Sequence, residues 1–131
     1  FDLSRMVPEF EQAPIDGAVL RPAVFEPTAN KWRGRCCAGF QVHVTDPRRY
    51  APYAATLRLL QAAIRLHPGE FAWRPPPYEY EYEKLPIDLL IGDASIRRRL
   101  EGQEPIDAIA ASWHSAVEEF SAMSREHHLY P

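Results

Sequence analysis

The clearest pattern in the chain lies in Cys37–Thr45, where apolar and polar side chains alternate from Phe40 onward. The apolar set is Phe40, Val42 and Val44, and the polar set is Gln41, His43 and Thr45. A period of two predicts a β-strand with one face toward a core and three hydrogen-bonding side chains on the other face. Asp46-Pro47 follows as a turn signal, so the strand is expected to end there.

A second strand is predicted over Val19–Phe25, which is rich in branched residues and is bounded by Asp16-Gly17 and Pro27. Pro22 inside this segment lacks a backbone donor. The strand is therefore expected at a sheet edge, or in a ladder that does not need the N–H of residue 22.

Three segments show helical signals. A helix is predicted over Pro52–His67, a short one over Asp93–Leu100 with Asp93 as its cap, and a long one from Pro105 to about His127. The apolar stripe of the first is Tyr53, Leu57, Leu60 and Ile64; that of the long helix is Ile106, Ile109, Ala110, Trp113, Val117 and Phe120.

Other segments stay open. Phe1–Gly17 can hold a short helix but has poor periodicity, Ile87–Ile91 is a strand or the entrance of a helix, and Glu70–Glu83 contains possible strands. The order of elements favours the α+β class, with a small mixed, mostly antiparallel sheet and about three helices packed on it. A length of 131 residues fits one domain, expected over residues 1–131.

Composition narrows the function classes. A hydrophobic fraction of 46% and a charged fraction of 25% are typical of a globular chain. A net charge of −3 argues against a dedicated nucleic-acid binder, and no apolar run is long enough to span a bilayer. The two cysteines, Cys36 and Cys37, are adjacent, which is unsuited to a structural disulfide or a zinc site, and at least one is expected to be buried. Neither a metal nor a cofactor is expected.

The polar row beside His43 has two interpretations. It can line a ligand cleft, or it can be a partly exposed sheet face without a binding role. Lys31, Arg33 and Arg35 lie in the connection between the two strands, where they can bind an anionic ligand or simply face water.

No self-contained catalyst is evident. Glu118 and Glu119 are adjacent on a predicted helix and diverge around it, so they cannot act across one bond. The Tyr/Glu alternation over residues 78–83 can be a sugar-stacking platform, but an edge strand with tyrosines inward and glutamates outward is the preferred interpretation. No phosphate loop or serine nucleophile motif is present. No catalytic residue is therefore assigned.

Several blocks together resemble a known family. They are Leu20-Arg21-Pro22-x-x-Phe25-x-Pro27, Lys31-x-x-Gly34-x-x-Cys37-x-Gly39-Phe40-Gln41-Val42-His43-Val44-Thr45-Asp46, Ile87-Asp88-Leu89-Leu90-Ile91-Gly92, and Ile109-x-x-x-Trp113 with the closing Leu129-Tyr130. The chain resembles the C-terminal domain of the bacterial exo-β-N-acetylmuramidase family, long filed as a domain of unknown function, from about Ile15 to Tyr130.

The resemblance implies a C-terminal module of a two-domain glycoside hydrolase, whose Rossmann-like N-terminal domain carries the catalytic glutamate. It places Arg21, Lys31, Gln41 and His43 near an interdomain cleft that binds terminal N-acetylmuramic acid. The implied partners are peptidoglycan fragments and the N-terminal domain of the same chain, and the implied location is extracellular or periplasmic. On this view the module alone is inactive, and the start at Phe1 is expected to be an excised or processed terminus. The alternative is a non-catalytic carbohydrate-binding or interdomain scaffold module.

Overall fold

A computed structural model describes residues 2–130, so the expectation about Phe1 lies outside the described residues. The chain divides into two compact units, with the boundary between Ala72 and Trp73. The prediction of one domain over residues 1–131 stays a prediction.

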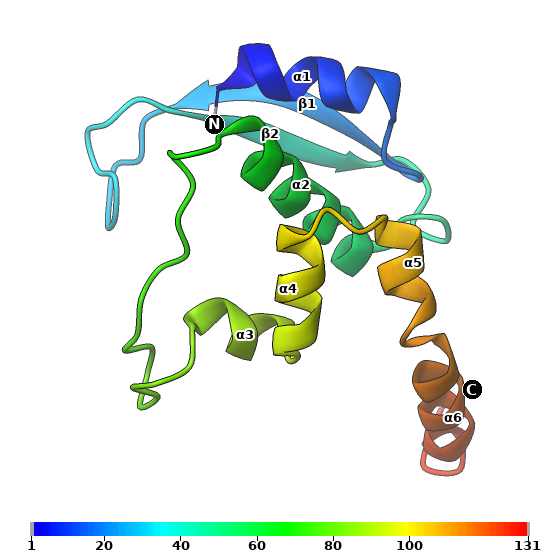
Figure 1. Cartoon of the computed structure of the whole chain (residues 1–131). Coiled ribbons are helices and arrows are strands. Elements are labelled where there is room, and N and C mark those ends of the chain that lie inside the picture. Colours follow the sequence, from blue (N-terminus) through cyan, green and yellow to red (C-terminus); the bar gives the residue numbers. More distant parts are fainter. Residues whose placement is uncertain (1, 131) are drawn as a thin grey trace. The chain divides into compact units, whose positions relative to one another are not determined.

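The first unit contains two helices and a β-hairpin (Figure 1). Its elements are α1 (Leu3–Gln12), β1 (Ala18–Phe25), β2 (Cys37–Val44) and α2 (Pro52–Leu66). The carboxylate of Asp2 caps α1 by accepting the N–H of Ser4 at 2.9 Å. Pro52 stands in the first turn of α2, where its missing N–H costs little.

The sheet is a two-stranded antiparallel hairpin. Pro22 lies opposite Phe40. A two-stranded sheet has only edge strands, so the position of Pro22, which lacks an N–H, can face away from the ladder. The prediction of an edge strand is confirmed. The predicted core face is wrong for two of its residues. Phe40 is half-buried, but Val42 and Val44 are 39% and 49% exposed, because the small sheet is not covered along its whole length.

The core of the first unit lies where α1, α2 and the hairpin meet. The rings of Phe10 and Phe40 pack edge to face, with centroids 5.7 Å apart and an interplanar angle of 72°. The buried cluster is Met6, Phe10, Ile15, Ala18, Ala55, Ala62 and Ala63. Three of these are small alanine side chains of α2. The sequence stripe of α2 is therefore only partly correct, since Leu57 is buried whereas Tyr53 is 41% exposed.

Polar contacts between α1 and α2 explain a helix that the apolar pattern showed only weakly. Arg58 of α2 donates to the carbonyls of Ala13 and Pro14 at 2.6 and 3.0 Å, just beyond the last turn of α1. Arg65 of α2 pairs with Glu9 of α1 at 2.7 Å. These contacts give partners to two carbonyls just after α1 and to one carboxylate of α1.

The second unit consists of short helices: α3 (Pro86–Ile91), α4 (Ala94–Glu101), α5 (Ile106–Ala111) and α6 (His114–Arg125). Residues 2–130 thus hold six helices and one hairpin. The α+β class and the antiparallel pairing are confirmed, but the expected number of about three helices is wrong.

The long helix predicted from Pro105 is broken at Ser112–Trp113. The hydroxyl of Ser112 donates to the carbonyl of Ile109 at 2.6 Å, and the N–H of Trp113 bonds to Ala110 three residues back. Arg99 adds to this, because its guanidinium donates to the hydroxyl of Ser112 and to the carbonyl of Ala108. Side-chain hydrogen bonds that compete for backbone carbonyls destabilise or bend a helix, which is consistent with a break at this point.

Glu70–Glu83 forms no strand. It contains a tight turn closed by a single antiparallel bridge between Tyr78 and Glu81. Tyr80 and Tyr82 are 91% and 70% exposed, so the inward tyrosines expected for an edge strand are wrong. Three consecutive prolines before the turn remove the donors that a strand ladder would need.

Candidate functional site

The polar row predicted on β2 is exposed and continues onto β1. Arg21 lies directly opposite Gln41 in the hairpin register, and its Nη2 donates to Gln41 Oε1 at 2.6 Å. His43 lies on the same face, one step further along the strand and opposite Val19. The structure therefore brings three of the four predicted site residues onto one solvent-facing surface, which we call the polar hairpin face.

Lys31, the fourth residue, is not part of this face. It is exposed in the loop of residues 26–36, which joins the ends of the two strands. That loop begins after the Phe25–Cys37 pair, four residues along each strand from Arg21 and Gln41. At ~3.3 Å per residue the start of this loop lies about 13 Å along the strand from Arg21, so Lys31 belongs to a different part of the hairpin.

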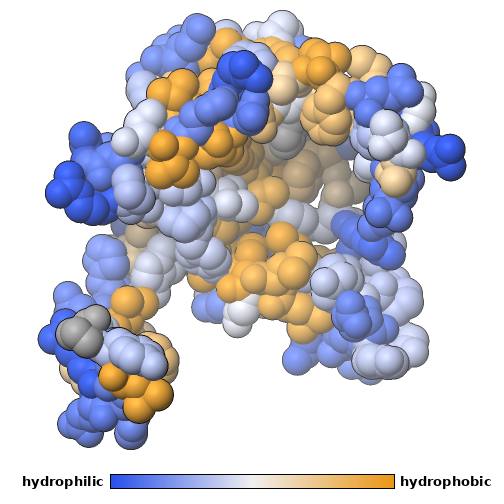
Figure 2. All heavy atoms as spheres, turned by 180° about the vertical axis from the view of Figure 1, so that it is seen from behind, coloured by the Kyte–Doolittle hydropathy of each residue, from blue (hydrophilic) through white to orange (hydrophobic). Residues whose placement is uncertain are grey.

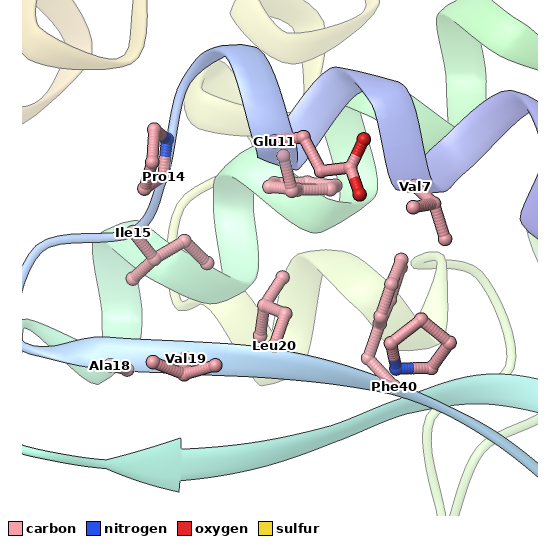
Figure 3. Close-up of a pocket in the computed structure, with 10 residues that line it drawn as sticks. Val7, Glu11, Pro14, Ile15, Ala18, Val19, Leu20 and Phe40 are labelled. Atoms are coloured by element: carbon pink, nitrogen blue, oxygen red, sulfur yellow. The ribbon is translucent and has the colours of Figure 1, made fainter.

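An apolar pocket of about 280 Å³ lies on the opposite face of the hairpin, between β1 and α1 (Figure 3). Leu20 and Phe40 extend from the strands toward α1, while Val7 and Glu11 extend from the helix. Glu11 is the one charged residue among the ten that line it. The sequence did not predict this pocket, because α1 lacked a clear apolar stripe.

Carboxyl groups with shifted pKa values all serve local structure. The hydroxyl and N–H of Ser95 donate to Asp93, the cap of α4, and lower the pKa of this carboxyl. The guanidinium of Arg99 binds both oxygens of Glu104 and lowers its pKa. The same direction holds for Asp2 and Glu81. A general acid for glycoside cleavage needs a raised pKa, so none of these four carboxyls suits that role.

Arg97 and Arg99 of α4 form ion pairs with nearby carboxylates. Arg97 pairs with Asp88 of α3 at 2.6 Å and with Glu101 of its own helix at 2.9 Å. Arg99 pairs with Glu104, and the side chains of Arg97 and Arg99 are 17% and 26% exposed, so neither is simply a solvated surface cation. A signal was present in the sequence, since Glu101 stands four residues after Arg97.

Residues 2–130 contain neither a metal-binding cluster nor a membrane-spanning helix. No group of three or more histidine, cysteine or acidic side chains comes together there in a way that could hold a metal ion. No helix in this part of the chain has both the length and the apolar character needed to cross a membrane.

The fold is shared with a bacterial protein of known structure. The crystal structure of a DUF1343 family protein from Bacteroides fragilis matches the whole chain with a TM-score of 0.76 at 18% identity, and the match covers 33% of that protein. The present chain therefore shares the α+β fold of about a third of that protein.

Sequence comparison identifies the family. Residues 1–130 match the family described as "Exo-beta-N-acetylmuramidase NamZ, C-terminal", and the chain belongs to this family. It is also 25% identical over 116 residues to the peptidoglycan beta-N-acetylmuramidase NamZ of Bacillus subtilis. That alignment covers 88% of the present chain but 26% of the relative, so the chain corresponds to about a quarter of the curated protein that it resembles.

Proposed function

We propose that this chain is the C-terminal module of an exo-β-N-acetylmuramidase and forms part of the interdomain cleft that binds a terminal N-acetylmuramic acid. The observation that supports this most is the Arg21–Gln41 hydrogen bond on the exposed hairpin face. It holds a guanidinium and an amide side by side in solvent, where neither is needed for the core.

The polar hairpin face carries the groups that a carbohydrate ligand needs. Arg21 has five N–H donors and uses one of them on Gln41, so others remain for hydroxyl, acetamide or carboxylate oxygens. The amide of Gln41 and the imidazole of His43 can each donate and accept, which matches the mixed character of sugar hydroxyls. Charge-assisted hydrogen bonds from Arg21 to a lactyl carboxylate would favour muramic acid over a neutral sugar.

The rest of the catalytic machinery is proposed to lie outside this chain. In the family, the catalytic glutamate is expected in a Rossmann-like N-terminal domain, which is the proposed partner of this module. The proposed substrates are peptidoglycan fragments that end in N-acetylmuramic acid, and the proposed location is extracellular or periplasmic. Lys31 is proposed to contact the substrate away from Arg21, because the hairpin separates the two cations.

The test compares the full-length protein with this chain on a chromogenic β-N-acetylmuramide. We expect the full-length protein to release N-acetylmuramic acid and the chain alone to release none. Arg21→Gln should raise KM by roughly tenfold with little effect on kcat, because it removes a charged contact to the bound sugar. Arg48→Gln is the matched control, since Arg48 carries the same charge, is 90% exposed and lies outside the polar hairpin face. Equal kinetics for the two variants would refute the role of Arg21.

A second candidate function, an interdomain scaffold, has one observation in its favour. Val117, Phe120 and Met123 recur along one side of α6 and are 56–64% exposed. Figure 2 shows apolar surface on the part of the molecule that carries the C-terminal helix. An exposed apolar stripe of this kind often marks an interface. Under this alternative, Arg21→Gln would leave both KM and kcat unchanged, while Phe120→Ser would destabilise the full-length protein.

A further inference from the structure

A second candidate for ligand binding lies at the far end of the hairpin. The loop of residues 26–36 extends beyond the strands (Figure 1) and borders a hollow of about 330 Å³. This volume is within the range of about 300–1,000 Å³ that is usual for small-molecule sites. The residues that line it are Trp32, Arg35, Cys36, Cys37 and Ala38.

The loop presents an aromatic ring and a cation together. The guanidinium of Arg35 lies over the indole of Trp32, with Cζ 5.4 Å from the ring centroid, and the N–H of Arg35 bonds to the carbonyl of Trp32 at 2.9 Å. Trp32 is nevertheless 62% exposed. Its φ of +64° lies in the left-handed region, which is unfavourable for a large side chain and is not offset here by burial of the ring.

The loop is also cationic. Lys31, Arg33 and Arg35 are all exposed, and none of them forms an ion pair with another residue in the 2–130 range. A solvent-facing indole beside a guanidinium that has no carboxylate partner among residues 2–130 suits a ligand that has both an apolar face and a carboxylate. A sugar acid has both features, since its C–H groups can pack on the ring while its carboxylate binds the guanidinium.

The position of the hollow relates it to the polar hairpin face. Cys37 stands on the same face as Gln41, four residues away, which is about 13 Å along the strand. That separation exceeds the reach of a single sugar ring. A ligand in the hollow is therefore a different sugar from the one bound at Arg21 and Gln41.

We infer that the Trp32–Arg35 hollow is a second glycan subsite, which binds another muramic acid residue of the same peptidoglycan strand. Trp32 packs on the sugar ring and Arg35 binds its lactyl carboxylate. This inference rests on the proposed function for its choice of sugar acid. It adds a preference for longer glycan fragments, which the polar hairpin face alone does not provide.

Binding to the 131-residue chain tests the hollow directly. N-acetylmuramic acid, N-acetylglucosamine and muramyl dipeptide are titrated while tryptophan fluorescence is recorded, with Trp32→Phe identifying the signal of Trp32. We expect N-acetylmuramic acid to change that signal and to protect Cys36, which is exposed in the hollow, from alkylation. N-acetylglucosamine, which lacks the carboxylate, should bind roughly tenfold more weakly. Tighter binding of muramyl dipeptide would place the carboxylate on the peptide and overturn the assignment to the lactyl group.

Kinetics of the full-length protein separate this subsite from the proposed function. Arg35→Gln should lower kcat/KM on a muramyl tetrasaccharide by roughly tenfold and leave the chromogenic monosaccharide unaffected. Arg33→Gln is the matched control, because it removes the same charge from the same loop without lining the hollow. Equal losses for the two variants, or a loss on the monosaccharide as well, would overturn the subsite. A full-length protein that is inactive on the monosaccharide would refute the proposed function, whereas the titration would still decide whether the hollow binds a sugar acid.

Discussion

Substitution of Phe40 by alanine should weaken the packing of the hairpin against the rest of the first unit. Full burial of a phenylalanine contributes about 3–5 kcal/mol relative to alanine. Phe40 is only half-buried, which reduces this to about 2 kcal/mol, and loss of its edge-to-face contact with Phe10 adds about 1 kcal/mol. We therefore expect Phe40→Ala to lower the free energy of unfolding by about 2–3 kcal/mol.

Urea denaturation followed by circular dichroism at 222 nm measures this loss, and hydrogen exchange of the β1 and β2 amides locates it. Phe25→Ala is the control, because Phe25 lies in the same hairpin and is 56% exposed. It should lower the free energy of unfolding by less than about 1 kcal/mol, as is usual for an exposed position. If both variants lose the same stability, Phe40 does not attach the hairpin to α1 and the packing argument is refuted.

Two further predictions concern turns and caps. Gly17→Ala should lower the free energy of unfolding several-fold more than Gly34→Ala. Both glycines have φ near +70°. A Cβ at residue 17 would lie 2.5–2.9 Å from backbone atoms, whereas a Cβ at residue 34 would meet nothing within 4 Å. Equal thermal shifts would contradict this. Asp93→Ala should destabilise most above the ordinary carboxyl pKa of 3.8, because the folded protein lowers the pKa of Asp93. The stabilisation by this cap is lost as the pH falls through the lowered value, so the melting temperatures of variant and wild type should converge in acid.

Strands and capped helices were predictable because their signals are local. The alternation after Cys37 gave the second strand to within one residue, and Asp93 marked the start of α4. The break between α5 and α6 was not predictable, because it depends on Arg99, thirteen residues before Ser112 in the sequence. Apolar periodicity continues through the break, so it reveals neither the local hydrogen bond from Ser112 to Ile109 nor the tertiary one from Arg99.

The candidate site was predictable in part for the same reason. Arg21, Gln41 and His43 share a face because strand pairing is regular. The alternation along the strand indicated Gln41 and His43, whereas Arg21 was indicated by the family motif alone. The hollow at Trp32 was missed, since no sequence period indicates that a loop residue adopts a left-handed conformation with its ring exposed. The expectation of at least one buried cysteine failed there too, because Cys36 is exposed and Cys37 half-buried.

The hairpin carries its core-packing residues on one face and the proposed ligand-binding residues on the other, so the two roles can be tested by separate substitutions. Because side chains alternate along a strand, Phe40 lies toward the core while its neighbour Gln41 lies on the polar hairpin face. A substitution on that face removes hydrogen-bonding groups without opening the packing around Phe10. Arg21→Gln should therefore alter substrate binding at constant stability, and Phe40→Ala should alter stability first. A variant of Arg21 that lost both together would show that the exposed pair holds the hairpin together rather than a ligand.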